Sequence, residues 1–290
     1  MSAISTHTLR VPGATLTYDV RGVLPTTDRP PLLMIGQPMG AEGFGTLASH
    51  FPERTVVTYD PRGLGRSTRD DGRRDNDPAV QAEDLHALIG ALGSGPVEVF
   101  GSSGGAVTGL ALVTAHPDDV STLVAHEPPL LAVLPDADRA FAAERAVREA
   151  YHAGGSGVGM AQFIAMSMWH GEFTDAYAAQ PAADPAAFGM SADDDGRRDD
   201  PLLSGVSDAV THYRPDVRAL TSSPTRLVIA AGVQSTDTIT GRTTAALAEA
   251  LGLPLTIFPS HHGGFLGGEY GQAGEPDAFA ARLHDVLDTA

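Results

Sequence analysis

Short apolar runs alternate with longer amphipathic segments along most of this chain. Several of the runs are continuous rather than alternating, which is typical of parallel strands covered by helices on both faces. They fall at 32–35, 55–59, 97–100, 121–125, 225–231 and 255–258, and an alternating segment at 15–20 predicts an N-terminal edge strand. Helical spacing predicts helices over 78–92, 105–116, 243–251 and 277–287. Strands and helices in this order indicate an α/β fold with a mostly parallel, doubly wound sheet.

The pattern changes between residues 130 and 220, where no central-strand run occurs. Helical spacing appears there at 136–151, 160–169 and 202–213, and the stretch 180–200 is rich in Ala, Pro and Asp. We therefore predict a helical cap, residues 130–220, inserted into a core domain made of residues 1–129 and 221–290. The acidic run at 193–200 is expected to be a solvated loop and not a metal site.

The pentapeptide Gly-Ser-Ser-Gly-Gly at 101–105 stands between a predicted strand and a predicted helix. A Gly-x-Ser-x-Gly turn in that context holds its central serine in a strained conformation, with the hydroxyl exposed at the carboxyl end of the sheet. The free N–H groups at the start of the helix face developing negative charge. Ser103 is therefore a candidate nucleophile. The alternative is a glycine-rich turn with an idle serine.

Three more segments accompany this turn. The strand at 32–35 ends in Gly-Gln-Pro-Met-Gly (36–40), the strand at 55–59 runs into Asp-Pro-Arg-Gly-Leu-Gly-Arg-Ser (60–67), and the strand at 255–258 precedes Ser-His-His-Gly-Gly-Phe (260–265). With these four motifs the chain resembles the α/β-hydrolase superfamily over nearly its whole length. The resemblance implies the α/β-hydrolase fold, with a catalytic serine, acid and histidine in that chain order. It also implies an oxyanion hole formed by the backbone N–H groups of Gln37 and Gly104.

Two adjacent histidines compete for the role of general base. His262 precedes Gly263-Gly264-Phe265, which resembles the His-Gly-Gly-Phe ending of related hydrolases, so we favour it over His261. Only a histidine that can reach the serine at hydrogen-bond distance can serve. Metal binding by the pair is disfavoured because neighbouring side chains rarely converge on one ion and no third ligand stands nearby.

The acid departs from the commoner pattern. Many α/β-hydrolases place it after the strand at 225–231, but the frame there is Gly232-Val233-Gln234-Ser235, and Asp237 follows two residues later. Asp237 could swing in, or it could cap the next helix. Glu127 offers a second position, in a His-Glu-Pro-Pro segment that resembles the acid segment of zearalenone-type lactone hydrolases, which also carry a Ser-Ser-Gly nucleophile turn. We favour Glu127 and keep Asp237 as the alternative.

The expected activity is hydrolysis of a carboxylic ester or lactone of an apolar small molecule, without a cofactor or metal. Met39, Met166, Trp169 and Phe265 are expected to line the substrate pocket. Two other readings stay open: a cofactor-free oxygenase or perhydrolase on the same triad, and a non-catalytic small-molecule receptor, since fold alone does not assign function.

Charge limits the partners. The formal net charge is −17 and the isoelectric point is about 4.8, which disfavours nucleic acid and anionic membranes. No apolar stretch is long enough to span a bilayer, and the N-terminus lacks the features of a signal peptide, so a cytoplasmic location is the expectation. The chain has no cysteine, which excludes disulfides. The sequence does not determine the oligomeric state, and a homodimer stays open.

Overall fold

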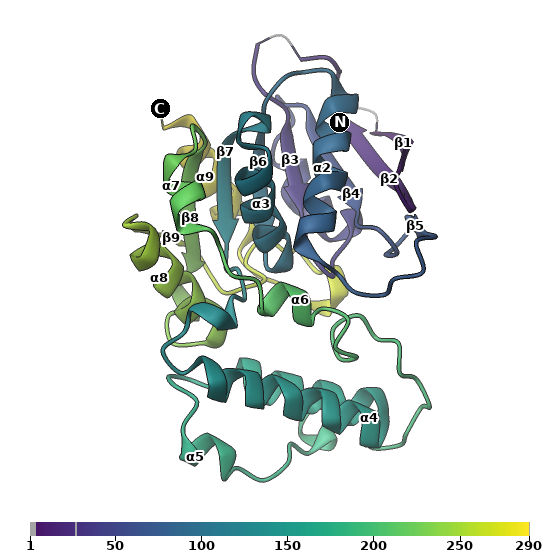
Figure 1. The fold of residues 1–290 in the computed structure, drawn as a ribbon, viewed down its shortest axis with the longest axis vertical. Helices are drawn as coiled ribbons and strands as arrows, with labels where there is room; N and C mark the ends of the chain where they lie inside the picture. Colours follow the sequence, from purple (N-terminus) through teal and green to yellow (C-terminus); the bar gives the residue numbers. More distant parts are fainter. Residues whose placement is uncertain (1–3, 27, 290) are drawn as a thin grey trace.

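The computed structural model describes residues 4–26 and 28–289 and is built around one large sheet (Figure 1). The strand order is β1-β2-β4-β3-β6-β7-β8-β9, with the short β5 paired to β2. Pairing is parallel from β4 through β9 and antiparallel where β2 meets β1, β4 and β5. The strands are β1 (Ile4–Val11), β2 (Ala14–Arg21), β3 (Leu32–Ile35), β4 (Val56–Asp60), β5 (Thr68–Arg69), β6 (Val97–Ser102), β7 (Val120–His126), β8 (Arg226–Gly232) and β9 (Leu255–Phe258).

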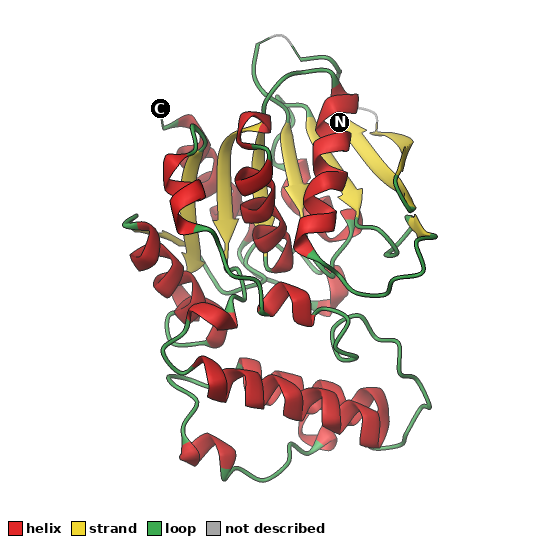
Figure 2. Cartoon of the chain, in the orientation of Figure 1, coloured by secondary structure: helices red, strands yellow, loops and turns green. Residues whose placement is uncertain are grey.

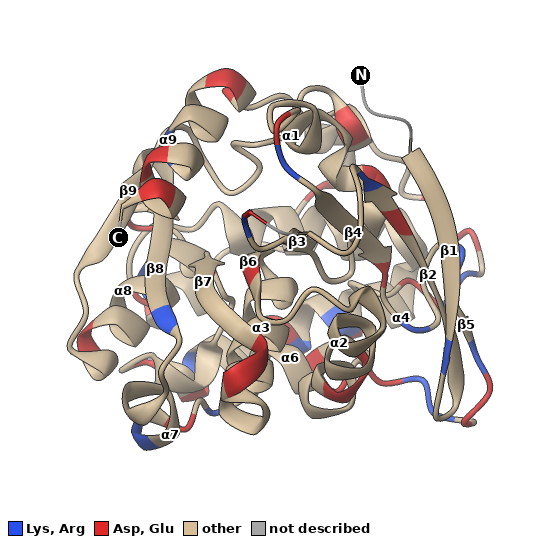
Figure 3. Ribbon diagram, turned by 90° about the horizontal axis from the view of Figure 1, so that it is seen from above, with Lys and Arg blue, Asp and Glu red and all other residues tan. Residues whose placement is uncertain are grey.

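Helices cover both faces of this sheet (Figure 3). The helices on one face are α2 (Pro78–Leu92), α3 (Gly104–Ala115) and α8 (Ile239–Leu251), and those on the other are α1 (Gly45–Ser49) and α9 (Pro276–Asp288). Within β6, Val99 packs into the apolar cluster beneath α2 and α3, whereas Phe100 packs into the cluster beneath α1 and α9. Because both faces of the strand are buried, these two neighbouring residues are both apolar although they face opposite sides of the sheet.

The N-terminal edge differs from the prediction. The segment at 15–20 does form β2, but β1 lies outside it and is the true edge strand. Most β1 side chains are exposed, so no apolar alternation marks this strand in the sequence. Apolar and polar residues alternate along a strand only when one of its faces is buried. Because β1 buries little of either face, its sequence does not alternate in this way.

Residues 130–220, the segment predicted to be a cap and called the cap below, contain helices and loops but no strand in their described part (Figure 2). Its main element is α4 (Ala137–Ser167), where Gly155, with a φ of 81°, separates the two helical stretches that the sequence predicts at 136–151 and 160–169. Shorter elements complete this region: η3 (Leu131–Val133), α5 (Asp175–Ala178), η4 (Pro185–Phe188), α6 (Asp208–Thr211) and α7 (Val217–Ser222).

The helix predicted at 202–213 is wrong for most of its length, because only α6 is helical there. Val210 of α6 and Leu220 of α7 belong to the same apolar cluster as Leu110 of α3, so this end of the cap packs directly on a core helix. The apolar residues at 202–213 pack in different places: Leu203 joins the apolar cluster of the cap, whereas Val210 joins the cluster around α3. Their spacing therefore does not mark one face of a helix. No helix in the described residues is both long and apolar enough to cross a membrane.

The remaining short helical turns belong to loops at the ends of the strands. They are η1 (Ala41–Phe44), η2 (Pro117–Asp119), η5 (Val233–Ser235) and η6 (Glu269–Gly271). The loop that holds η1 follows β3, and the loop that holds η5 follows β8. Both therefore lie at the carboxyl edge of the parallel strands, where ligands bind in open α/β sheets.

Candidate active site

Ser103 occupies the turn between β6 and α3. Its φ of 57° and ψ of −129° lie outside the regions that non-glycine residues ordinarily adopt. Such strain is tolerated when the surrounding structure over-determines it, and here the Ser103 N–H donates to the carbonyl of His126 at 2.9 Å. The Ser103 hydroxyl has no hydrogen-bond partner among the described residues and faces a cavity.

Close approach requires glycine on the helix side of this turn. A Cβ added to Gly105 would lie 2.2 Å from the carbonyl oxygen of Ile35, and one added to Gly104 would lie 2.8 Å from both Cβ and the carbonyl oxygen of Gln37. The turn is therefore pressed against the loop that follows β3. Gly104 also begins α3, so its N–H has no partner within the helix.

His262 and Glu127 form a hydrogen-bonded pair beside Ser103. His262 Nδ1 and Glu127 Oε2 are 2.7 Å apart, and His262 lines the same two cavities as Ser103. Glu127 is fully buried, with 0% of its surface exposed. An imidazole whose Nδ1 is held by a buried carboxylate presents its Nε2 as a proton acceptor.

Glu127 reaches His262 because β7 lies between β6 and β8. Ser102 pairs with His126 across β6 and β7, so Ser103 and Glu127 leave adjacent strands at the same level. The Glu127 N–H donates to the carbonyl of Ala230 in β8 at 2.9 Å, and Glu127 itself has a φ of 49°. A carboxylate placed one strand away from the common position therefore meets the same histidine.

Three donors hold the Glu127 carboxylate. The Gly232 N–H donates to Oε1 at 2.9 Å, the Thr240 hydroxyl donates to Oε2 at 2.6 Å, and His262 bonds to Oε2. Burial alone would raise the pKa of Glu127, but the hydrogen bonds and charge interactions with the histidines outweigh it and hold the pKa well below its usual range. The sequence offered no signal for Gly232 or Thr240, since their role depends on how β8 and α8 pack.

Asp237 lies elsewhere. Its side chain is exposed, and its carbonyl accepts a hydrogen bond from the Gly171 N–H at 2.9 Å. The suggestion that it caps the following helix is wrong, because Thr238 occupies the N-cap position of α8. Of the two acid candidates, the structure brings only Glu127 to His262. His261 lines one of the cavities, and its Nδ1 accepts from the Gly263 N–H at 3.1 Å.

His126 is a further buried group that the sequence analysis did not single out. Its ring is 0% exposed, its Nδ1 lies 3.1 Å from the Ser102 hydroxyl, and its Nε2 lies 3.9 Å from Glu127 Oε1. Burial lowers the pKa of His126 to about 4, so the imidazole is neutral at neutral pH. Its ring packs edge-on against Phe279 and Phe265.

Two adjoining cavities meet at Ser103, with volumes of about 800 Å³ and about 590 Å³. The larger extends over the η1 loop and the strand ends near Asp60 and Arg66, and the smaller extends beneath the cap. Both include Gln37, Ser103, His262, Met160 and Phe163 in their linings. Their size and apolar walls fit a small organic molecule.

The residues expected to line the pocket divide into two groups. Met39 and Phe265 line the larger cavity and Met166 lines the smaller. Trp169 lines neither, contrary to expectation: its ring packs edge-on against Tyr177, and its Nε1–H donates to the carbonyl of Glu172 at 3.0 Å. Trp169 lies beyond the end of α4, so the helical spacing expected over 160–169 does not fix where its ring packs.

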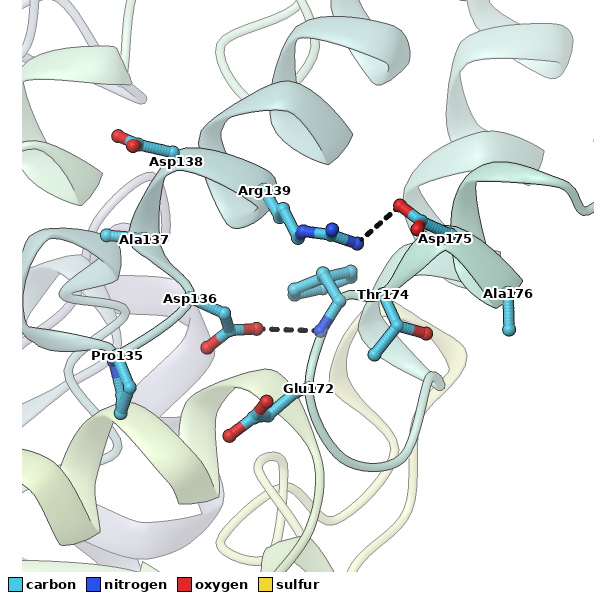
Figure 4. A pocket seen from close by; sticks show the side chains of 10 residues that line it. Pro135, Asp136, Ala137, Asp138, Arg139, Glu172, Thr174, Asp175 and Ala176 are labelled. Atoms are coloured by element: carbon cyan, nitrogen blue, oxygen red, sulfur yellow. Dashed lines mark hydrogen bonds and ion pairs between the residues drawn. The ribbon is translucent and has the colours of Figure 1, made fainter.

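A third hollow, of about 660 Å³, lies on the cap away from Ser103 (Figure 4). Its walls come from the start of α4 and from the loop before α5. The Asp136 carboxylate accepts from the Phe173 N–H at 2.6 Å across it, and Arg139 pairs with Asp175 at 2.8 Å. Polar walls and the absence of any nucleophile–base pair in its lining separate this hollow from the candidate active site.

Among the described residues one group has metal-like spacing: ligand atoms of His86, His116 and Asp119 lie within 4.8 Å of one another. His86 lies on α2, His116 directly follows α3, and Asp119 is the last residue of η2; none of them lines either cavity. His86 Nδ1 already bonds to Asp119 at 2.6 Å, and His116 Nε2 bonds to Glu83 at 2.8 Å. In this structure the carboxylates of Asp119 and Glu83 are therefore hydrogen-bonded to the two imidazoles.

Known proteins match this chain over most of its length. Residues 30–183 match the model of the alpha/beta hydrolase fold family. The chain is 30% identical over 286 residues to the uncharacterized hydrolase YraK of Bacillus subtilis, covering 98% of this chain and 97% of that protein.

Two solved structures share the fold. A thermophilic esterase from Thermogutta terrifontis superposes with a TM-score of 0.63 at 20% identity, over 99% of this chain and 98% of that one. The enol-lactonase from Burkholderia xenovorans superposes with a TM-score of 0.61 at 18% identity, over 97% and 99%.

Proposed function

Because the chain belongs to the α/β-hydrolase fold family, we propose that it is a serine hydrolase that cleaves a carboxylic ester or lactone through an acyl-enzyme intermediate. One observation carries the proposal. A serine in a strained strand-to-helix turn shares its cavity with a histidine whose Nδ1 is held by a buried carboxylate. That combination of nucleophile, base and orienting acid is defined by geometry and recurs in acyl-transfer enzymes.

In the first half of the proposed reaction, Ser103 Oγ attacks the carbonyl carbon of the substrate while His262 Nε2 takes the hydroxyl proton. The two side chains must come into hydrogen-bond contact when substrate is bound, as apo geometry is often looser. The carbonyl electron pair moves to oxygen, where the N–H groups of Gln37 and Gly104 would stabilise it. The imidazolium then gives its proton to the leaving alcohol oxygen as the carbon–oxygen bond breaks.

The second half repeats these steps with water. Water attacks the acyl carbon while His262 takes one of its protons, and collapse of the intermediate returns that proton to Ser103 Oγ and releases the acid. In a lactone the alcohol released in the first half remains part of the acyl chain, so hydrolysis of the acyl-enzyme yields a single hydroxy acid. Glu127 stabilises the imidazolium in both halves and fixes its tautomer. The apolar walls of both cavities support an apolar substrate body.

Replacing Ser103 tests the proposal. We expect Ser103→Ala to lower kcat for p-nitrophenyl esters or lactones by roughly 10⁴-fold or more, with the fold intact, because only binding and oxyanion donors would remain. A serine-directed phosphonate should label Ser103 in the wild-type protein. Labelling at Ser102 alone, or full activity in Ser103→Ala, would overturn the assignment.

The same assays separate the alternatives on this fold. A cofactor-free oxygenase or perhydrolase would form product only with oxygen or peroxide present, whereas ester hydrolysis needs neither. A receptor would bind the substrate analogue without turnover.

A further inference from the structure

Two histidines and an aspartate converge on the face of the sheet that carries α2 and α3. Ligand atoms of His86, His116 and Asp119 lie within 4.8 Å of one another, and no other group of His, Asp and Glu in the described part of the chain meets this spacing. Asp119 follows His86 by 33 positions, so the fold and not the local sequence brings them together. The reaction proposed above uses none of the three.

The two imidazoles of this cluster are already aligned. Their rings are stacked, with centroids 3.9 Å apart and planes 9° from parallel. The Asp119 carboxylate holds Nδ1 of His86 at 2.6 Å, and the Glu83 carboxylate holds Nε2 of His116 at 2.8 Å. A simple surface pair looks different: His212 Nε2 bonds to Glu144 at 2.8 Å, and this pair belongs to no such group.

The separations suit a tetrahedral metal ion. Zinc binds nitrogen and carboxylate oxygen at about 2.0–2.2 Å, so its ligand atoms lie about 3.3 Å from one another. The separations in this cluster, from 2.6 Å to at most 4.8 Å, lie on both sides of that value. The side chains of His86, His116 and Asp119 are 48%, 23% and 20% exposed. An ion therefore reaches them from solvent, and small side-chain rotations bring them to it.

The donor set selects the class of ion. Two imidazole nitrogens and one carboxylate oxygen suit Zn²⁺, Cu²⁺ or Ni²⁺, whereas Mg²⁺ and Ca²⁺ prefer oxygen ligands alone. Glu83 bonds to one nitrogen of His116 and leaves the other for an ion, and carboxylates in this outer position commonly orient metal-bound histidines. The formal net charge of −17 also favours cations over anions near the surface.

We propose that His86, His116 and Asp119 form a binding site for a divalent transition-metal ion such as Zn²⁺. The ion takes the place of the proton that His86 Nδ1 and Asp119 Oδ2 share, and that proton is released to solvent. Bound there, it links α2 to the segment that follows α3. Leu85 and Leu112 bury the adjacent turns of these helices in the core, so the ion joins two backbones that are already fixed. The site is independent of the proposed hydrolysis.

Calorimetric titration of Zn²⁺ into protein freed of metal by EDTA and dialysis tests the proposal. We expect one ion to bind per chain with a micromolar or tighter dissociation constant and to raise the melting temperature, because it binds only the folded chain. Mg²⁺ should do neither. His86→Gln and His116→Gln should each weaken Zn²⁺ binding at least tenfold and abolish the rise in melting temperature. Both side chains are partly exposed, so the variants should fold.

Two controls locate the ion. His212→Gln removes a histidine that bonds to a carboxylate outside the cluster, and it should bind Zn²⁺ as the wild-type protein does. His262→Gln addresses the other imidazole–carboxylate pair, at the candidate active site, and it should also retain binding. Loss of binding in His262→Gln with retention in His86→Gln would place the ion beside Ser103 and overturn the proposal. Equal affinity in the wild-type protein and both cluster variants, or only weak binding of several ions, would overturn it as well.

Discussion

Two carboxylates with little solvent exposure, Glu127 at the candidate active site and Asp136 at the start of the cap, differ in what their hydrogen-bond partners can do. Glu127 accepts from one backbone N–H, one hydroxyl and His262, and Asp136 accepts from the Phe173 N–H and pairs with Arg242. Burial by itself would raise the pKa of each, and in each the bonded partners lower it below the usual value.

The partners explain the difference. His262 gains and loses a proton during the proposed reaction, so the Glu127 carboxylate beside it would stabilise the protonated imidazole in each half of that reaction. Arg242 remains charged, and it also donates to the carbonyl of Gly171 at 2.8 Å, so Asp136 and Arg242 tie the cap to α8. One arrangement therefore orients a proton acceptor, and the other fastens a segment of the chain.

Of the substitutions that test this difference, one at Glu127 is expected to have the largest effect, a loss of turnover. Glu127→Gln keeps the shape of the side chain but removes the charge that stabilises the imidazolium, so turnover should fall by roughly 10⁴-fold. Because Glu127 is buried, turnover and melting temperature must be measured on the same folded sample. Asp237→Asn is the control, and it should change both little because the Asp237 side chain is exposed. An active Glu127→Gln protein beside a folded but inactive Asp237→Asn protein would refute the role of Glu127.

The next effect concerns the cap. Asp136→Ala leaves the Arg242 guanidinium, whose side chain is 13% exposed, without its carboxylate, and should lower the free energy of unfolding by about 3 kcal/mol. Urea denaturation measures this loss, and limited proteolysis should show earlier cleavage within 130–220. Asp175→Ala removes a carboxylate that is 95% exposed at the same hollow and should cost less than about 1 kcal/mol. Equal losses in both variants would contradict the anchoring role of Asp136.

A smaller effect is expected from His126 as a function of pH. Its folded pKa of about 4 lies below the ordinary value of 6.5, so the unfolded chain binds the proton more readily and stability falls as pH decreases between these values. Between pH 7 and pH 5 this group should remove about 2 kcal/mol from the free energy of unfolding. His126→Asn should lose that part of the pH dependence. Chemical denaturation of both proteins at the two pH values measures the difference, and identical pH dependence would show that His126 titrates normally.

The smallest effect is expected at Trp169, the only tryptophan of the chain. Since its ring contacts Tyr177 and lies outside both cavity linings, binding of a phosphonate at Ser103 should leave its emission wavelength unchanged. Fluorescence of the labelled and unlabelled protein checks this. A shift in emission would mean that the cap rearranges when the site is occupied.

Local sequence was sufficient for the elements whose conformation depends on near neighbours. The apolar runs predicted the parallel strands and the α/β-hydrolase fold, which the family match and the solved structures confirm. The Gly-x-Ser-x-Gly pattern around Ser103 predicted its strained turn. The structure gives the physical reason for the two glycines that follow: Ile35 and Gln37 lie so close that no side chain would fit there. The sequence analysis also favoured Glu127 and His262, although only as candidates.

Tertiary structure decided which side chains meet. The acid candidates Glu127 and Asp237 differ because β7 lies beside β8, which brings Gly232 and Thr240 to one carboxylate and leaves the other in solvent. The packing of Trp169 against Tyr177 and the irregular segment around α6 were equally hidden. Periodicity records that a face is buried, whereas the identity of the partner depends on packing between segments far apart in the chain.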